Sequence, residues 1–301
     1  MKSFRDSALV SCPLPPLAST GPPPDIRESL FAFLAGRTFT LELVACQPGM
    51  LSGASMLLEK AEELGLEVDR VAPEGSPLGE GALVCRARAG ARQAARAEEL
   101  LLGCIGKASG VATAAAAFVS LAGGEARVVC GAWKKVAPEG RPGLRQAIRT
   151  GGAGMRIADE PFVYLDKNYV RMLGGVARAV RRARLIPGRV VVVQLRGEAG
   201  PVTMEAREAA REGAGILMVD TGRIEDLVAV RETARREEFR GRIAVAFGGG
   251  VNLGNFREVL AAGADIVDVG RAIIDAPLLD FRLDVVDDTA CRPLSPARAG
   301  L

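Results

Sequence analysis

The sequence predicts an α/β protein in two parts: a small N-terminal α+β domain, then an incomplete or elaborated parallel α/β barrel. From Arg127 onward, short apolar runs alternate with segments of helical spacing, and several runs end in glycine, lysine or aspartate. Strands separated by helices of about 10–15 residues are typical of parallel βα repeats. Before residue 125 the strand-like and helix-like segments follow no such rhythm, which predicts a separate first domain.

Composition excludes several classes of protein. The chain has 301 residues, of which 49% are hydrophobic, and a formal net charge of +3. Only ten Phe, two Tyr and one Trp are available to stack on bases, so we expect no nucleic-acid partner. The apolar runs are too short or too rich in small residues to span a bilayer, and no signal peptide is recognisable. We therefore expect a cytoplasmic protein that binds small anions.

Cysteine and histidine usage limits the chemistry further. The six cysteines form no CxxC pair, which favours reduced, mainly buried thiols. Histidine is absent, so the usual general base and all His-ligated metal sites are excluded. Chemistry must rely on Lys, Arg, Asp, Glu and backbone dipoles. A bound metal would be a hard cation held by oxygen, such as Mg²⁺.

The first domain is expected at residues 26–125, after an irregular Pro-rich lead-in at residues 1–25. Asp25 is a candidate N-cap for a short helix that reaches Leu34. Alternating apolar residues predict strands at 39–46, 67–71 and 82–87. Helical spacing predicts a helix at 56–64, ending before Gly65, and a long alanine-rich helix at 91–122.

The barrel is expected at residues 126–286, followed by a tail at 287–301. Six strands begin near residues 127, 162, 190, 215, 243 and 266, with helical segments between them. Six is fewer than the eight of a regular barrel, which favours an incomplete one. A doubly wound open sheet is the alternative. Because no GxGxxG with a distal acid supports a dinucleotide site, the barrel is preferred.

The segment 242–274 has the order strand, glycine loop, helix, strand and glycine. Gly248, Gly249 and Gly250 follow an apolar run, Asn252 is a candidate N-cap for a helix through Ala262, and Gly270 ends the next run. Glycine lets an anion approach backbone N–H groups, so this βαβ unit is expected to hold a phosphate. The alternative is that the glycines only form tight turns.

In a barrel, ligands bind at the carboxyl ends of the strands. The residues expected there are cationic or small with a few acids, namely Trp133, Lys134, Lys135, Asp166, Lys167, Gln194, Arg196, Asp220, Gly248, Gly249, Gly250 and Gly270. This set suits a polyanion such as a sugar phosphate. The alternative is a set of solvated charges at loop ends.

An ordered series of motifs resembles the quinolinate phosphoribosyltransferase family, including its paralogues associated with molybdate transport. KASGVAT resembles the family's LSGIAT, WKKVAP its TRKTTP, RTGGAGMR its RCGGGxNHR, and LDKNYV its IKDNHI. LMVDT resembles MLDN, and FGGGVNLGNFREVLAAGADIVDVG resembles SGGITLENIREYAETGVDVISVG. APLLDFRLDV follows APALDLSLDI, so the resemblance extends from about Phe39 to Val286.

The resemblance implies a small N-terminal α+β sandwich domain followed by an open parallel α/β barrel. It also implies a phosphoribosyltransferase that acts as a homodimer with Mg²⁺. The family joins quinolinate to phosphoribosyl pyrophosphate (PRPP), releasing pyrophosphate and CO₂ to give nicotinate mononucleotide. These demands suit the residue types present. Acids stabilise an oxocarbenium-like ribosyl centre, Mg²⁺ and cations assist pyrophosphate departure, and Arg or Lys bind carboxylates.

The resemblance also implies roles for individual residues. Lys134 and Lys135 match the Arg-Lys pair that binds the substrate carboxylates, and Lys135 is also a catalytic candidate. Arg156 matches the arginine of the family's HR pair, and Lys167 could supply the lysine of its KDNH segment. Asp220 matches the acid near the ribose and the metal. Gly248, Gly249, Gly250 and Gly270 fall on the 5′-phosphate loop.

The departures from the family pattern concentrate at the pyridine dicarboxylate end. Met155 and Tyr169 replace two histidines, and Asp166 and Lys167 are swapped. A substrate-binding arginine on a helix falls on Glu99, although Arg96 lies one turn earlier and could compensate in part. The first acid of the ribose pair falls on Gln194, and Phe247 replaces a serine.

Three hypotheses remain open. The protein could still make nicotinate mononucleotide with a rebuilt acid pocket. It could be a paralogous phosphoribosyltransferase with another acceptor, such as a monocarboxylate or a neutral or cationic nitrogen heterocycle. It could also be a non-catalytic ligand-binding relative that keeps only the phosphate site. Retention of Lys134, Lys135, Arg156 and Asp220 together favours an enzyme.

Overall fold

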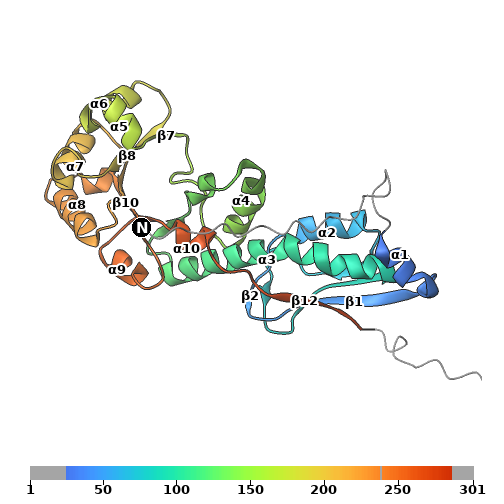
Figure 1. Ribbon diagram of the computed structural model, residues 1–301. Helices are drawn as coiled ribbons and strands as arrows, with labels where there is room; N and C mark the ends of the chain where they lie inside the picture. Colours follow the sequence, from blue (N-terminus) through green and yellow to red (C-terminus); the bar gives the residue numbers. More distant parts are fainter. Residues whose placement is uncertain (1–24, 238, 287–301) are drawn as a thin grey trace, which may run out of the picture.

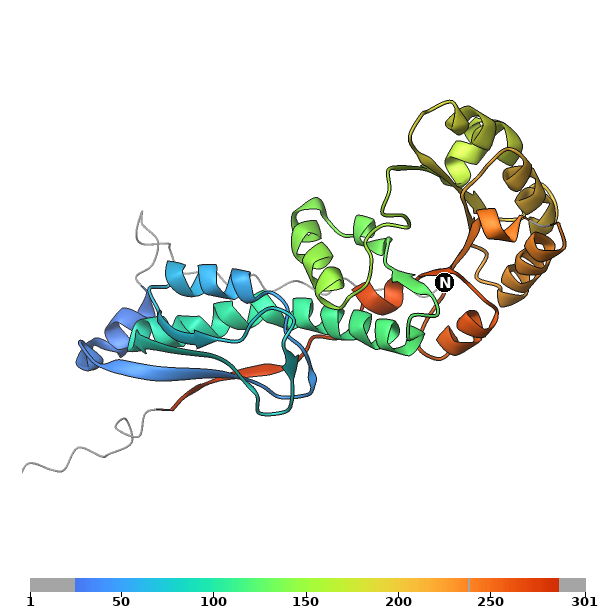
Figure 2. The same ribbon diagram turned by 180° about the vertical axis from the view of Figure 1, so that it is seen from behind.

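A computed structural model describes residues 25–237 and 239–286 of the chain. The tail and almost all of the Pro-rich lead-in lie outside these residues. The described chain forms two bodies that share one long helix, α3 (Ala91–Ala122), as Figures 1 and 2 show from opposite sides. The two-part α/β architecture expected from the sequence is confirmed.

The first body is a four-stranded antiparallel sheet covered by helices. Its strand order is β12–β1–β5–β3, with β1 at Thr38–Ala45, β3 at Glu67–Val71, β5 at Leu83–Gly90 and β12 at Phe281–Val285. One face packs against α2 (Ala54–Glu63) and the first half of α3, through residues such as Leu43, Leu57 and Leu101. The remaining elements are α1 (Ile26–Leu30), which Asp25 caps as expected, η1 (Ala32–Leu34) and a small ribbon of β2 (Gly49–Met50) with β4 (Pro77–Leu78).

Strand β12 comes from the far end of the chain and is the main difference from the expected fold. Its Leu283 pairs with Leu43 of β1, and its Phe281 is buried in the core of the first body. The range 126–286, expected to be barrel, therefore ends with a strand of the first sheet. The alternating residues of β12 span only five positions, and their partner strand is remote in sequence, so local pattern alone does not place it.

The second body is an open parallel barrel. Its strand order is β6–β11–β10–β9–β8–β7, and β6 and β7 are not paired with each other among the described residues. The strands are β6 (Arg127–Val129), β7 (Phe162–Leu165), β8 (Val190–Leu195), β9 (Ile216–Val219), β10 (Ala244–Gly248) and β11 (Ile266–Asp268). Each lies within a residue or two of its expected position, so the incomplete barrel is confirmed.

Helices follow the strands on the outside of the barrel. They are α4 (Arg141–Thr150), α5 (Lys167–Met172), α6 (Val176–Arg184), α7 (Val202–Arg211), α8 (Ile224–Arg236), α9 (Phe256–Ala261) and α10 (Arg271–Ile274), with short turns η2 (Ala132–Lys135), η3 (Pro138–Gly140) and η4 (Arg240–Arg242). The outer core lies between strands and helices and includes Val193, Leu217 and Val245. The inner core is smaller and contains Val192, Met218 and Ala246.

Helix α3 belongs to both cores. By length and composition it could cross a membrane, but Leu101 and Ile105 are buried in the first body, and Phe118 in the second. The Phe118 ring meets Phe256 of α9 edge to face, with centroids 5.1 Å apart. These contacts identify α3 as a core helix that connects the two bodies. The four cysteines within the described residues, Cys46, Cys85, Cys104 and Cys130, are free.

The segment that leads from the barrel to β12 crosses α3 at two glycines. The Leu279 N–H donates to the Gly106 carbonyl at 3.0 Å, and the Lys107 ammonium donates to the Ala276 carbonyl at 2.6 Å. A Cβ on Gly110 would lie 1.9 Å from the Pro277 carbonyl oxygen. The crossing therefore requires glycine at 110.

We predict that Gly110→Ala lowers the free energy of unfolding by about 1–3 kcal/mol, because a backbone segment must move to admit the methyl group. Gly103→Ala is the matched control on the same helix, since nothing lies within 4 Å of its would-be Cβ. That variant should be more stable by about 0.5–1 kcal/mol through helix propensity alone. Urea denaturation of both variants measures their free energies of unfolding. Equal changes in the two variants would contradict the close approach of the Pro277 backbone to Gly110.

Glu74 joins the two bodies through hydrogen bonds. Its carboxylate accepts from the Ser52 hydroxyl (2.6 Å), from the Gly53 and Ala54 N–H groups at the start of α2 (2.9 and 3.0 Å), and from the Thr150 hydroxyl at the end of α4 (2.7 Å). Burial opposes ionisation of Glu74, but these hydrogen bonds outweigh it and hold its pKa below the ordinary value of 4.5.

We predict that Glu74→Gln lowers the free energy of unfolding at pH 7 by about 1–3 kcal/mol, because two N–H donors lose a charged acceptor. A carboxyl whose pKa is lowered by folding stabilises the native state above its unfolded pKa. That contribution disappears as the pH falls below about 4.5 and through the lower folded pKa. The difference in free energy of unfolding between the variant and the unaltered protein should therefore shrink on acidification. Urea denaturation at several pH values measures this difference, and a difference that does not change with pH would contradict the lowered pKa of Glu74.

Candidate functional site

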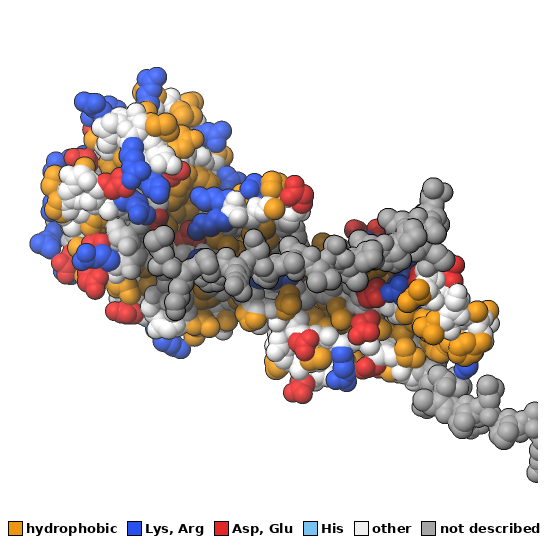
Figure 3. Space-filling view, in the orientation of Figure 1, with side chains coloured by type: hydrophobic (Ala, Val, Ile, Leu, Met, Phe, Trp, Pro, Cys, Tyr) orange, Lys and Arg blue, Asp and Glu red, His pale blue; other side chains and the backbone are white. Residues whose placement is uncertain are grey.

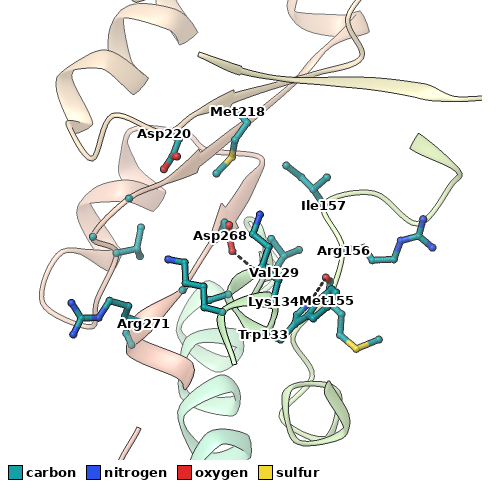
Figure 4. Close-up of a pocket in the computed structure, with 18 of the residues that line it drawn as sticks. Val129, Trp133, Lys134, Met155, Arg156, Ile157, Met218, Asp220, Asp268 and Arg271 are labelled. Carbon is teal, nitrogen blue, oxygen red and sulfur yellow. Dashed lines mark hydrogen bonds between the residues drawn. The ribbon is translucent and has the colours of Figure 1, made fainter. Parts of the chain in front are cut away.

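A cavity of about 1130 Å³ opens at the carboxyl ends of the barrel strands. Its walls come from the strand ends, from η2 and from the starts of the helices that follow. Figure 3 shows basic side chains on the rims of a hollow in the barrel body, and Figure 4 shows the lining at close range. The position agrees with the place where parallel barrels bind ligands.

Strand alternation explains which side chains reach the cavity. The inner core residues Val129, Tyr164, Val192, Met218, Ala246 and Ile266 each point into the barrel. Two residues further along, at the strand ends, the same face carries Gly131, Asp166, Gln194, Asp220, Gly248 and Asp268. We call these six residues the inner layer. It contains three carboxylates and no cation.

Asp220 is held by two neighbours. The Gln194 amide donates a hydrogen bond to its Oδ2, and the Arg196 guanidinium contacts the same oxygen at 3.3 Å and the Asp220 carbonyl at 2.9 Å. Gln194 is oriented in turn by the Lys167 N–H, which donates to its Oε1 at 2.7 Å. One oxygen of Asp220 is therefore occupied, and Oδ1 has no hydrogen-bond partner among the described residues.

Asp268 lies at the centre of the cavity floor (Figure 4). Its Oδ1 accepts the Gly131 N–H at 2.9 Å, and Gly131 and Gly248 flank it without side chains. Burial raises the pKa of Asp268, and so does the charge of Asp220. The Gly131 hydrogen bond and the charges of Lys134 and Lys135 act in the opposite direction.

The two lysines extend from the η2 turn that follows β6. The Lys134 Nζ lies 5.9 Å from the centroid of the Tyr164 ring, within range of a cation–π contact. Burial raises the pKa of the Tyr164 phenol, and the carboxylates of Asp268, Asp220 and Asp166 raise it further. Tyr164 is therefore a neutral hydrogen-bonding group rather than a base.

Two arginines stack on aromatic rings at the opposite wall. The Arg145 Cζ lies 3.9 Å from the centroid of the Trp133 ring, and the Trp133 indole donates to the Met155 carbonyl at 3.1 Å. The Arg156 Cζ lies 5.0 Å from the Phe162 centroid, and its side chain points away from Asp268 and Lys134 (Figure 4). Both guanidiniums of this wall therefore lie against aromatic rings.

The glycine loop after β10 reaches the cavity through Gly249 and Gly250, both in the left-handed region with φ of 95° and 77°. The helix expected to start at Asn252 starts later, at Phe256. The Asn252 side chain instead bonds within the loop, accepting the Gly254 N–H at 2.8 Å and donating to the Gly250 carbonyl at 3.1 Å. Local side-chain-to-backbone bonds of this kind compete with helix initiation.

The structure brings most of the predicted site residues together. Those that line the cavity are Trp133, Lys134, Lys135, Arg156, Asp166, Gln194, Asp220, Gly249, Gly250 and Gly270. Arg196 is outside the lining and contacts Asp220 instead. Gly248 lies in the inner layer, where its missing side chain leaves room beside Met218 and Asp268. Lys167 and Arg96 are not part of the lining. Lys167 begins α5 after the capping residue Asp166, whereas Arg96 lies on α3 in the first body.

Among the lining residues that sequence reasoning missed, three matter most for the chemistry: Asp268, Tyr164 and Arg145. Asp268 lies within the apolar run that ends at Gly270, and its position two residues after Ile266 gives it the inward face. Tyr164 is inward by the same alternation. Arg145 lies on α4, and only the fold shows that it stacks on Trp133.

Comparison with known proteins agrees with this geometry. The model of the quinolinate phosphoribosyl transferase C-terminal domain matches residues 111–284, and that of the N-terminal domain matches residues 25–109. The chain belongs to the quinolinate phosphoribosyltransferase family. Members of this family are pentosyltransferases, which makes this protein an enzyme of that type.

Individual relatives support the assignment. The chain is 31% identical over 244 residues to the human nicotinate-nucleotide pyrophosphorylase (carboxylating), covering 80% of each chain. It is 28% identical to the probable enzyme of that name from Archaeoglobus fulgidus, covering 81% of this chain and 93% of the relative. The crystal structure of nicotinate-nucleotide pyrophosphorylase from Pyrococcus furiosus has the same fold, with a TM-score of 0.74 at 20% identity over 87% of this chain and 72% of that one.

We predict that Gly249→Ala weakens the binding of a phosphoribosyl ligand at least tenfold. Its φ is unfavourable for alanine, and the new Cβ would lie 2.9 Å from the Gly222 nitrogen and 3.2 Å from Asp220 Oδ1. Gly241→Ala, with nothing within 4 Å of its Cβ, is the control and should bind normally. Calorimetric titration with PRPP measures both, and unchanged affinity in the Gly249 variant would contradict the phosphate-loop assignment.

Proposed function

We propose that this enzyme transfers a phosphoribosyl group from PRPP to a nitrogen heterocycle and releases pyrophosphate, with quinolinate as the first candidate acceptor. The observation that carries the proposal is the arrangement of one cavity. The backbone of Gly249 and Gly250 lies on one side, Lys134 and Lys135 on another, and Asp220 between strand ends on the floor. Such a cavity provides for an anion, a leaving pyrophosphate and a positively charged ribosyl centre.

In the proposed reaction, the ring nitrogen of the acceptor uses its lone pair to form a bond to C1 of the ribose. The bond from C1 to the pyrophosphate oxygen breaks, and its electron pair leaves with pyrophosphate. The 5′-phosphate would bind at Gly249, Gly250 and Gly270, and Lys135 would stabilise the leaving group.

Mg²⁺ fits the acidic side of this cavity. Asp220 Oδ1 has no hydrogen-bond partner among the described residues, and a hard cation prefers a small number of carboxylate oxygens together with phosphate oxygens and water. We propose that Asp220 holds Mg²⁺ with PRPP bound. The ion would neutralise negative charge on the departing pyrophosphate.

A second candidate acceptor class has its own support. The lining carries five cations, Lys134, Lys135, Arg145, Arg156 and Arg271, against four acids, Asp166, Asp220, Asp268 and Asp275, which leaves a net charge of 5 − 4 = +1. Arg156 points away from the floor of the cavity. Position 99, where the family resemblance places a substrate-binding arginine, holds an acid, Glu99, which forms an ion pair with Arg27 at 2.5 Å. These features favour a monocarboxylate or an uncharged heterocycle over a dicarboxylate.

We further propose a cytoplasmic homodimer. The exposed apolar residues Ile26 and Phe33, at the far end of the first body, offer surface for such a contact.

Pyrophosphate release from PRPP and Mg²⁺ tests the function, with quinolinate, monocarboxylate and uncharged heterocycles supplied separately. Turnover of quinolinate with CO₂ release would support the first candidate, and turnover of the other bases alone would support the second. Lys135→Ala should lower the rate about 10–100-fold, because the leaving group loses a cation. The control Lys60→Ala, on α2 and paired with Glu63, should leave it unchanged. The proposal would be contradicted if none of the acceptors in the panel supported pyrophosphate release.

A further inference from the structure

The inner layer contains a carboxylate to which the roles described so far assign no task. Asp268 lines the cavity between the glycine loop and the lysines of η2. The pairing register places it level with Gly248 of β10, and Asp220 follows Val219, which is level with Phe247 on the other side of β10. Asp220 and Asp268 are therefore at the same height, one strand apart on either side of Gly248.

The strands that carry the two carboxylates are separated by one intervening strand. Neighbouring strands lie about 4.8 Å apart, so the backbones of β9 and β11 are about 10 Å apart across β10. Gly248 and Gly131 contribute no side chains beside Asp268. The two acids thus face a common space directly below the glycine loop that is proposed to hold the 5′-phosphate.

The two acids differ in how their charge is compensated. Asp220 is paired with the Arg196 guanidinium and receives a hydrogen bond from Gln194. Asp268 forms no ion pair within 4 Å among the described residues, and its one hydrogen-bond donor is the neutral Gly131 N–H. A carboxylate with little compensation interacts most strongly with a positive charge that develops beside it.

We infer that Asp268 is a catalytic residue whose carboxylate stabilises the oxocarbenium-like ribosyl centre during phosphoribosyl transfer, opposite Asp220. The inference rests on the proposed function and deepens it. When the bond from C1 to pyrophosphate breaks ahead of bond formation to the acceptor nitrogen, positive charge appears on C1 and the ring oxygen of the ribose. Asp268 is placed on the floor below that centre, and it transfers no proton.

Because the charge is needed in the transition state only, Asp268→Asn should lower kcat about 100-fold while the KM values for PRPP and the acceptor change less than threefold. Asparagine keeps the shape and the acceptor for the Gly131 N–H. Asp284→Asn is the control, because it removes an exposed acid from β12 in the first body and should leave kcat unchanged. The measurement is steady-state pyrophosphate release with the best acceptor.

A double variant separates a charge effect from a structural one. Gln194 occupies the inner layer on the other side of Asp220, so Gln194→Glu returns a carboxylate to the same layer. In the Asp268→Asn background it should recover at least tenfold in kcat if negative charge is what was lost. No recovery would mean that the loss of negative charge is not what slowed the Asp268→Asn variant, which overturns the inference.

The remaining outcomes are also decisive. An Asp268→Asn variant with kcat within threefold of the unaltered enzyme overturns the inference, although the proposed function stands. A rise in KM for PRPP with unchanged kcat also overturns it, because Asp268 would then bind the ground state. If the unaltered protein releases no pyrophosphate with any acceptor, the proposed function fails first, and the role of Asp268 fails with it.

Discussion

The crossing of α3 by the segment from Ala276 to Leu279 is the contact on which the rest of the structure depends. Close approach at Gly110, the hydrogen bond from Leu279 to Gly106 and the bond from Lys107 to Ala276 hold this segment against the helix. On one side of the crossing the chain has just formed α10, whose first residues line the cavity. On the other side it becomes β12 and completes the first sheet. One helix surface therefore positions both an edge of the site and a strand of the other body.

The site itself follows from strand alternation around an open barrel. Small residues in the inner core leave space, and the next inward positions bring acids and glycines to one level. Cations come from loops above that level, chiefly Lys134 and Lys135 on η2. Anion-binding groups thus surround a floor of carboxylates. This separation of charge suits a reaction in which a polyanion departs from a carbon that becomes positive.

The two ends of the cavity differ in their side chains. Left-handed glycines at 249 and 250 keep the loop open to an anion. At the other end, Trp133 carries Arg145 on its face and Arg156 stacks on Phe162. Met155 lies where the motif that RTGGAGMR resembles has a histidine. Aromatic stacking orients a guanidinium and limits which of its edges a ligand can reach. Acceptor choice will therefore depend on shape and hydrogen bonding as well as on charge.

Local sequence pattern was enough to predict the class of fold, the six barrel strands, the long helix and the glycine loop, because each depends on periodicity and on residues with distinct backbone preferences. Contacts between elements that are remote in sequence are visible only in the folded chain. In the fold, β12 lies beside β1, and Asn252 bonds within a turn and does not cap a helix. Lys167 and Arg96 lie outside the cavity lining. The fold also revealed that Asp268 and Asp220 are neighbours, because the strands that carry them are remote in sequence and lie on either side of β10 only in the folded chain. Local pattern fixes the face on which a side chain lies, whereas its neighbours depend on how remote strands are ordered.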